Sequence, residues 1–235
     1  MTTTTEKILA MFVEVPIASF RQSRAREYAE TYPVPPPSTV YGMLLSMVGE
    51  MDRYKHCGTR LAMALPRPPE AMLPEGAAQR AIALVSQPQK STVIRTFRRF
   101  KKKDIHDPSN ARPDYQELLT DVRFITWVDA GEDNSQPTLA ERLQMAFANP
   151  ASINRFGGLC LGESRDLVND VTLLPKNYQG QSLQWLVQDE NGLLTLPYWV
   201  DHVGSKGTHW QRYIILEPSE LSHPPESAWT VIKAT

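Results

Sequence analysis

The stretch "VIRTFRRFKKKDIHDPSNARPDYQELLTDVRFITWV" (93–128) decides the architecture that the sequence predicts. Its two ends, residues 93–100 and 121–128, alternate with a period of two, which is typical of β-strands. The twenty residues between them, 101–120, are too many for a tight turn inside a compact domain. We therefore expect a long hairpin, a thumb over about 93–128, that projects from the body and carries an irregular tip.

On the N-terminal side of this hairpin, the sequence predicts a strand, a loop, a helix and two more strands. The apolar run "ILAMFVEV" (8–15) indicates a buried strand. A proline-rich loop then keeps the chain extended up to Ser38 or Thr39, each a natural N-cap for a helix over 38–51. Two further segments have the composition of strands: "RLAMALP" (60–66) and "RAIALVS" (80–86).

On the C-terminal side, the spacing of apolar residues predicts a second helix over 138–150. A glycine-rich connection, "RFGGLCLGESRDLV" (155–168), follows and is flanked by short strands. The pair Asn191-Gly192 is a type I′ hairpin signal between two apolar strands within 183–200. The segment "QRYIILE" (211–217) is expected to be the last strand.

This order of elements, β-α-β-β-α-β, is that of the ferredoxin-like fold, whose topology RNA-recognition-motif domains share. The predicted fold class is therefore α+β: a ferredoxin-like, RRM-like domain with a projecting β-hairpin thumb and a small C-terminal β appendage. We expect residues 1–7 to be a disordered tail, residues 8–170 to form the ferredoxin-like RNA-binding domain, and residues 171–235 to form the small C-terminal β region.

Composition narrows the class of protein. The 235 residues carry 25 Lys and Arg against 26 Asp and Glu, a net charge of −1, and 41% are apolar, which suits a globular core. Two isolated cysteines, Cys57 and Cys160, indicate neither a disulfide framework nor a cysteine-based zinc site. With no signal-peptide pattern and no membrane-length apolar run, we expect a soluble cytoplasmic protein without membrane contact, metal or cofactor.

The positive charge is concentrated in "RTFRRFKKK" (95–103), although the whole chain is nearly neutral. Lysine at a sheet edge is an ordinary device against aggregation, so a solvated edge strand is one interpretation. Six cations in nine residues repel each other unless a polyanion neutralises them, and Phe97 and Phe100 add surface on which bases can stack. This pattern favours contact with nucleic acid through Arg95, Arg98, Arg99 and Lys101.

Three other segments are candidates for RNA contact only if the fold brings them together. The loop after the first strand carries Arg21, Arg24 and Arg26, and guanidinium groups suit phosphate contacts. The predicted helix start is an anion site by its dipole and free N–H groups, and "GGLCLGES" (157–164) permits close backbone approach. Each has a simpler explanation alone: a polar loop, a helix cap and a tight turn. The predicted topology brings all three to one face, around a groove. The helix-start candidates are Ser38, Thr39, Tyr41 and Gly42.

A catalytic site is not evident, and we assign no catalytic residue. A metal-independent ribonuclease needs an acid and a base, typically from His, Tyr or Lys, and the five histidines are dispersed. The plausible partners are His106 with its neighbouring lysines, and His202 with Lys206 and His209. The chain contains neither a Gly-x-Ser-x-Gly motif nor a His-Glu-x-x-His motif.

Taken together, four stretches resemble the Cas-five family, a CRISPR-associated member of the repeat-associated RNA-binding (RAMP) superfamily that serves in type I effector complexes (Cascade). They are "FRQSRAREYAETYPVPPPSTVYGMLLSMVG" (20–49), "RPDYQELLTDVRFITWV" (112–128), "GGLCLGES" (157–164) and "LPYWVDHVGSKGTHWQRY" (196–213). The last is similar to the tail of type I-B-like branches, including transposon-associated ones. The resemblance extends over most of residues 8–216.

The resemblance implies a non-catalytic subunit that binds the 5′ handle of the CRISPR RNA and caps the foot of the complex. It implies contacts with the backbone and large subunits, target DNA nearby, and RNA-guided DNA targeting in antiviral defence or transposition. In the family the first loop, the helix start, the thumb and the glycine loop face the RNA. The glycine-loop residues that the resemblance adds are Gly157, Gly158, Gly162, Ser164 and Arg165.

Two alternatives stay open at the level of sequence. One family branch cuts the repeat RNA itself, so the chain is alternatively a metal-independent endoribonuclease that processes CRISPR repeats. The other alternative is a protein-only scaffold, in which the basic strand pairs with an acidic partner protein.

Overall fold

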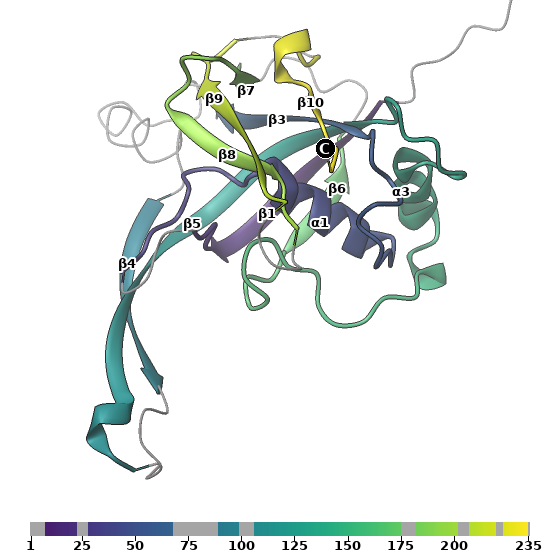
Figure 1. Ribbon diagram of the computed structural model, residues 1–235. Coiled ribbons are helices and arrows are strands. Elements are labelled where there is room, and N and C mark those ends of the chain that lie inside the picture. The colour runs from purple at the N-terminus through teal and green to yellow at the C-terminus, as the bar shows by residue number, and fades with distance from the viewer. Residues whose placement is uncertain are drawn as a thin grey trace, which may run out of the picture.

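The computed structural model describes residues 8–22, 28–67, 89–98, 106–174, 182–201, 207–219 and 223–234. Within these ranges the strands form a single ten-stranded sheet (Figure 1). The predicted tail, residues 1–7, and the predicted strand 80–86 lie outside the described residues. Among the described residues, none of the helices has the length and apolar character needed to cross a membrane.

The ferredoxin-like topology predicted from sequence is present. Its four strands are β1 (Leu9–Ala18), β3 (Arg60–Arg67), β5 (Ala111–Asp129) and β6 (Asp170–Leu173). They lie in the order β6-β1-β5-β3, and every neighbouring pair is antiparallel. Helix α1 (Pro37–Met47) connects β1 to β3, and helix α3 (Leu139–Ala148) connects β5 to β6.

Both helices pack on one face of this sheet. The alternation in β1 buries Met11, Val13 and Val15 on that face, where they join Leu44 of α1 and Leu143 of α3 in one apolar cluster. A smaller cluster covers the opposite face. Its centre is the pair Trp127 and Trp185, whose ring centroids lie 4.7 Å apart. The helices therefore close one face, and the start of α1 lies beside the end of β1.

The predicted projecting hairpin is present, but its bounds differ from the prediction. Strand β4 (Gln89–Arg98) pairs with residues 111–120, the first half of β5, and this paired arm extends from the body (Figure 1). We use the name thumb for this arm, residues 89–120. The second half of β5 lies in the body between β1 and β3, so residues 121–128 are not part of the thumb.

The expected irregular stretch 101–120 is also shorter than predicted, because residues 111–120 are strand. A short 3₁₀ helix, η2 (Pro108–Asn110), precedes them. The prediction relied on apolar alternation, and a two-stranded arm outside the core has little apolar surface to alternate. Backbone hydrogen bonds to β4 hold this part of β5 instead.

The C-terminal strands continue the same sheet. Beyond β3 the order is β7 (Ser182–Gln188), β9 (His209–Ile215) and β8 (Leu194–Trp199), while β10 (Thr230–Val231) pairs with β3 after a 3₁₀ helix, η4 (Glu226–Ala228). The predicted hairpin across Asn191-Gly192 is wrong, because β9 lies between β7 and β8. Gly192 packs directly on that strand: a Cβ there would lie 2.5 Å from the Tyr213 carbonyl oxygen.

The first helix is shorter than predicted, and neither Ser38 nor Thr39 caps it. Pro36 occupies the N-cap position without a side-chain hydrogen bond, and the helix ends at Met47. Gly49 ends this segment with φ +65°, a backbone conformation that glycine adopts at low cost. Met51, the last residue of the predicted helix 38–51, lies beyond the helix and is 95% exposed.

The second helix agrees with the prediction and starts with a capping box. The Thr138 hydroxyl accepts from the Glu141 N–H, and the Glu141 carboxylate accepts from the Thr138 N–H. A 3₁₀ helix, η3 (Pro150–Ser152), follows it. The two-residue strand β2 (Tyr28–Ala29) pairs in parallel with β5 at the base of the thumb.

Candidate nucleic-acid interface

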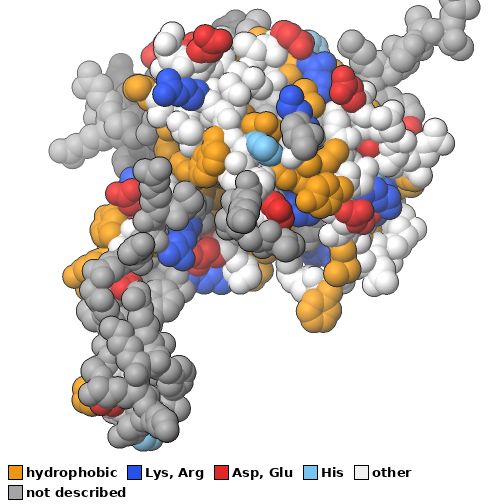
Figure 2. Space-filling model, viewed as in Figure 1, with side chains coloured by type: hydrophobic (Ala, Val, Ile, Leu, Met, Phe, Trp, Pro, Cys, Tyr) orange, Lys and Arg blue, Asp and Glu red, His pale blue; other side chains and the backbone are white. Residues whose placement is uncertain are grey.

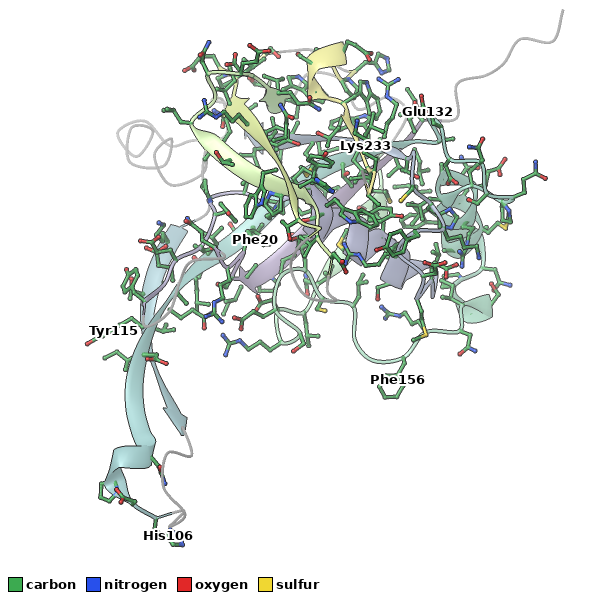
Figure 3. All side chains as sticks on the ribbon, viewed as in Figure 1. Phe20, His106, Tyr115, Glu132, Phe156 and Lys233 are labelled. Carbon is green, nitrogen blue, oxygen red and sulfur yellow. The ribbon has the colours of Figure 1, made fainter. Side chains whose placement is uncertain are left out.

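A cavity of about 390 Å³ opens beside α1, and we call it the α1 groove. Phe20, one of its residues, is seen between the base of the thumb and α1 in the view of Figure 3. The groove collects the end of β1 with the first loop, the start of α1, the glycine loop and the end of β8. Its lining residues are Ser19, Phe20, Arg21, Tyr32, Pro36, Ser38, Thr39, Gly42, Met43, Ser46, Arg53, Cys160, Gly162, Glu163, Pro197 and Val200.

One stripe of α1 forms a side of this groove. Thr39, Gly42, Met43 and Ser46 follow the spacing i, i+3, i+4 and i+7, which lies on one helical face. A Cβ added at Gly42 would meet nothing within 4 Å, so the helix backbone is open to the groove at this point. The first turn of α1 carries no acidic side chain, which leaves the positive end of its dipole available to an anion.

The glycine loop is bound to the end of β1 through Asp166. The buried Asp166 carboxylate accepts the backbone N–H of Ser19 at 2.8 Å and that of Glu163 at 2.9 Å. Gly162, with φ +108°, lies so close that a Cβ would be 2.8 Å from the Ser19 carbonyl oxygen. Burial raises the pKa of Asp166 above its ordinary value, and the two N–H donors act against that rise.

Ser19 itself is notable within the groove. The residue is 1% exposed, and its hydroxyl has no hydrogen-bond partner among the described residues. A buried hydroxyl without a partner is costly, so it is suited to donate to a group that enters the groove. Sequence reasoning missed both Ser19 and Asp166, because their contact joins positions far apart in the chain.

Arg165 braces the glycine loop instead of lining the groove. Its Nη2 donates to Gln116 Oε1 at 2.5 Å and lies 2.8 Å from Glu163 Oε2. Gln116 belongs to the thumb half of β5, so this arginine connects the loop to the base of the thumb. Gly157, Gly158 and Ser164 are also absent from the lining of the groove.

The prediction for Tyr41 needs correction. Its side chain is 0% exposed, its ring packs 6.3 Å from that of Trp199, and its hydroxyl donates to the Arg53 carbonyl oxygen at 2.8 Å. Burial raises the pKa of Tyr41 well above its ordinary value. Helical spacing turns Tyr41 toward the core while Gly42 faces the groove, so we remove Tyr41 from the residues expected to contact RNA.

Arg53 was missed by sequence reasoning and lines the groove. It lies in the loop after α1, and its guanidinium carbon is 5.4 Å from the centroid of the Trp199 ring. No local motif marks "MDRYKH" (51–56), because the arginine gains its place through β8, far along the chain. The C-terminal β region therefore contributes a wall of the groove through Pro197 and Val200.

The remaining predicted cations are not tested. Arg24, Arg26, Arg99 and Lys101 lie outside the described residues. Arg95 and Arg98 belong to β4, where the backbone pairs with Asp114 and Ala111, but their side chains lie outside the described part. On the face shown in Figure 2, basic and acidic side chains are interspersed.

None of the described histidines is among the residues that line the groove. His106 is at the far end of the thumb (Figure 3), and His209 Nε2 lies 2.8 Å from the Ala234 carbonyl oxygen. His202 and Lys206 fall outside the described residues. No cluster of three or more metal-ligating side chains occurs in the described ranges.

His56 is enclosed in a structural network. Arg142 Nη1 lies 2.9 Å from His56 Nε2, and because arginine only donates, that nitrogen is the acceptor. His56 Nδ1–H therefore donates to Asp133 Oδ2 at 2.8 Å, and the Ser135 hydroxyl lies beside the same nitrogen. A Ser-His-Asp catalytic arrangement needs Ser and Asp on opposite ring nitrogens, so this geometry is not one. Arg142 also binds Glu50 at 2.5 Å.

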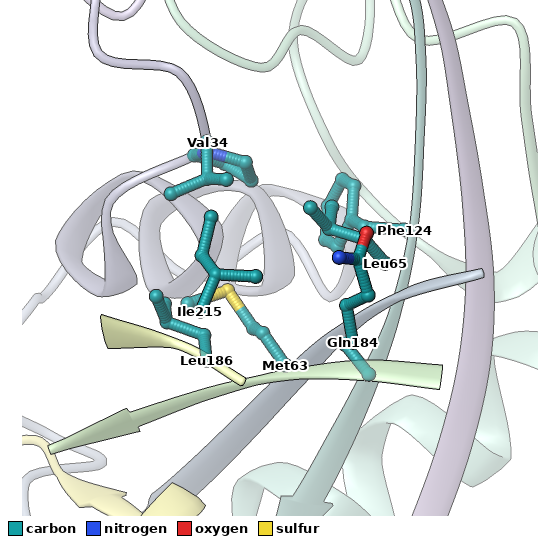
Figure 4. Close-up of a pocket in the computed structure, with 9 residues that line it drawn as sticks. Val34, Met63, Leu65, Phe124, Gln184, Leu186 and Ile215 are labelled. Carbon is teal, nitrogen blue, oxygen red and sulfur yellow. The ribbon is translucent and has the colours of Figure 1, made fainter. Parts of the chain in front are cut away.

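A second cavity, of about 10 Å³, lies between the chain before α1 and the sheet (Figure 4). Its lining is mainly apolar and includes Val34, Met63, Phe124 and Ile215. A space of this size holds at most a water molecule. It is a packing defect of the core, and the α1 groove remains the candidate site.

Comparisons with known proteins agree with this architecture. A chain from the structure named "CRISPR RNA-guided surveillance complex" superposes with a TM-score of 0.58, at 13% identity, over 91% of this chain and 90% of that one. At that identity the similarity concerns the fold alone. It defines the class by fold: an α+β protein that shares its architecture with a chain of that complex.

Sequence comparison identifies the family. Residues 8–180 match the family model described as CRISPR-associated protein (Cas_Cas5). The "CRISPR-associated protein Cas5" of Myxococcus xanthus (strain DK1622) is 39% identical over 222 residues, which is 93% of this chain and 94% of that protein. The chain belongs to the CRISPR-associated Cas5 family, as its resemblance to the Cas-five family implies.

Proposed function

We propose that this chain is a non-catalytic, RNA-binding subunit of a type I CRISPR surveillance complex, and that the α1 groove holds the 5′ handle of the CRISPR RNA. One observation carries the proposal. Three segments singled out from the sequence, the first loop, the helix start and the glycine loop, meet in a single groove through Arg21, Thr39 and Gly162.

The chemistry of the groove suits a ribose-phosphate chain. Arg21 supplies positive charge, the start of α1 presents its dipole, and Ser19 offers a buried hydroxyl. Such contacts hold a backbone by charge and shape and carry little sequence information. Target sequence would then be read by base pairing between the guide and the target.

In this proposal the subunit caps the foot of the complex and contacts the backbone and large subunits. The extended thumb supports such a role, since a two-stranded arm outside the core gains stability when a partner covers it. Antiviral defence and transposition differ in the partners that act after target recognition, and the groove serves both in the same way.

The substitution Thr39→Glu tests the groove directly. A glutamate in the first turn favours the helix dipole, so α1 stays folded, while the added carboxylate repels phosphate in the groove. We expect handle RNA to bind at least tenfold more weakly in fluorescence anisotropy at low salt, roughly the effect of losing one charged hydrogen bond. Thr195→Glu, at an exposed position on β8, is the matched control and should bind like the wild type. Equal affinity of all three proteins would contradict the proposal.

The two alternatives have their own tests. Incubation with labelled repeat RNA in EDTA would give a discrete product if the chain were a metal-independent ribonuclease, and substitution of His106 or His202 would abolish it. Purification of the native complex without any RNA would instead favour a protein-only scaffold. Neither alternative gains support from the described residues that line the groove.

A further inference from the structure

The α1 groove contains a second cation besides Arg21, namely Arg53. The stripe of α1 that lines the groove extends from Thr39 to Ser46, which is about 10 Å along the helix at 1.5 Å per residue. Arg21 belongs to the chain before α1, and Arg53 to the loop after it. The groove is therefore longer than one phosphate group needs, and its two arginines come from the chain segments before and after the helix.

The loop that carries Arg53 is held in place. The carbonyl oxygen of Arg53 accepts a hydrogen bond from the buried Tyr41 hydroxyl at 2.8 Å. Before Arg53, Glu50 binds Arg142 of α3 at 2.5 Å and Lys55 at 2.8 Å. The backbone at Arg53 is thus bound to α1, and the loop is bound to α3. The Arg53 side chain therefore lines the groove from a backbone position that these contacts fix.

The guanidinium of Arg53 is supported by an aromatic ring. It lies 5.4 Å from the centroid of Trp199, which is fully buried and contacts Tyr41 and Tyr54 as well. A planar guanidinium that lies on a ring can donate hydrogen bonds from its edge, and its five N–H groups allow more than one partner. Burial lowers the pKa of Arg53, and Tyr41, Tyr54 and Asp201 act in the opposite direction. Arginine keeps its positive charge in proteins.

We infer that Arg53, positioned by Trp199, is a phosphate-contact residue at a second anion subsite of the α1 groove. The phosphate it holds follows, along the same RNA strand, the phosphate bound at the start of α1. This inference rests on the proposed function and adds a ligand group and a residue to it. A partly desolvated cation attracts phosphate more strongly than a solvated one, because the local dielectric is lower.

The test compares Arg53→Gln with Arg53→Lys and the wild type. Arg212→Gln is the matched control, because Arg212 lies on β9, donates to the Glu190 carbonyl oxygen and does not line the groove. Binding of a single-stranded RNA with the host repeat's handle sequence is measured over a range of salt concentrations. For Arg53→Gln we expect about tenfold weaker binding and a log–log salt slope reduced by about 0.7, the value for one lost phosphate contact on a single strand. Arg53→Lys should keep the slope.

The outcomes separate this inference from the proposed function. Wild-type protein that binds no RNA would overturn both. RNA binding by the wild type with unchanged affinity and slope in Arg53→Gln would overturn the Arg53 subsite alone. Weaker binding with an unchanged slope would also overturn it, since the arginine would then act only through packing. If Arg53→Gln fails to fold, Arg53→Met takes its place, because it keeps an apolar side chain against Trp199 and removes the charge. A slope reduced by about 0.7 then supports the subsite, and an unchanged slope overturns it.

Discussion

The backbone N–H of Ser19 donates to Asp166 Oδ2 across 2.8 Å, although 147 positions separate the two residues. The same oxygen accepts the N–H of Glu163, so one carboxylate connects the end of β1 to the glycine loop. Both Ser19 and Glu163 line the α1 groove. The shape of the groove therefore depends on a carboxylate that does not itself line it.

Removal of this carboxylate should damage both stability and RNA binding. Asp166→Ala leaves the buried Ser19 N–H and the partly buried Glu163 N–H without their acceptor, and we expect a loss of about 2–4 kcal/mol in the free energy of unfolding. Asp166→Asn is the matched control, because its amide oxygen can still accept from both donors. Urea unfolding and RNA anisotropy measure the two effects. An alanine variant as stable as the wild type would show that the bond does not hold the loop.

Two substitutions at Gly42 should distinguish an effect on helix stability from an effect on RNA access to the groove. A Cβ at this position meets nothing within 4 Å, so Gly42→Ala should stabilise the protein by about 1 kcal/mol through helix propensity. Gly42→Leu extends a larger side chain into the groove, and we expect weaker RNA binding at unchanged or higher melting temperature. Thermal unfolding and anisotropy on the same samples check this. Wild-type affinity in Gly42→Leu would mean that RNA does not enter the groove at α1.

The His56 network should be important for stability and unimportant for RNA contact. His56→Ala removes one of the partners of the buried Asp133 carboxylate and one of the acceptors for Arg142, and we expect a loss of about 2–3 kcal/mol. His223→Ala, at an exposed position, is the matched control. At a temperature below its unfolding transition, where the variant is folded, His56→Ala should bind RNA with the same salt slope as the wild type. A changed slope would instead place His56 in the interface.

Stability should fall in acid partly through Glu50. The Lys55 ammonium and the Arg142 guanidinium outweigh the effect of burial and lower the pKa of Glu50 from 4.5 to about 2. A carboxylate with a lowered folded-state pKa contributes stability above 4.5, and that contribution disappears as pH falls toward 2. The stability difference between wild type and Glu50→Gln should therefore shrink in this window. Urea unfolding across the acid range measures it.

Glu190→Gln, at an exposed position, removes the same charge and serves as the control for this titration. If the stability difference between wild type and Glu50→Gln does not change across this window, the ion pairs of Glu50 do not couple protonation to folding.

The local elements were predictable because periodicity is a local property. The apolar run in β1, the helical spacing in α3 and the order of elements were enough for the ferredoxin-like topology, and the quoted motifs were enough for the family. The thumb was predicted with wrong bounds, since residues 111–120 are held by backbone pairing and show no clear apolar alternation.

The amino-acid sequence by itself determined which residues of each element are apolar and in which order the elements follow one another. It also determined that cations are concentrated near residue 95. Tertiary structure decided that β9 inserts between β7 and β8, that Tyr41 faces the core, and that Arg53 meets Trp199 at the groove. The reason is physical. Periodicity reports the environment of a side chain within its own element, whereas hydrogen bonds and ring contacts between distant residues exist only after the whole sheet has packed.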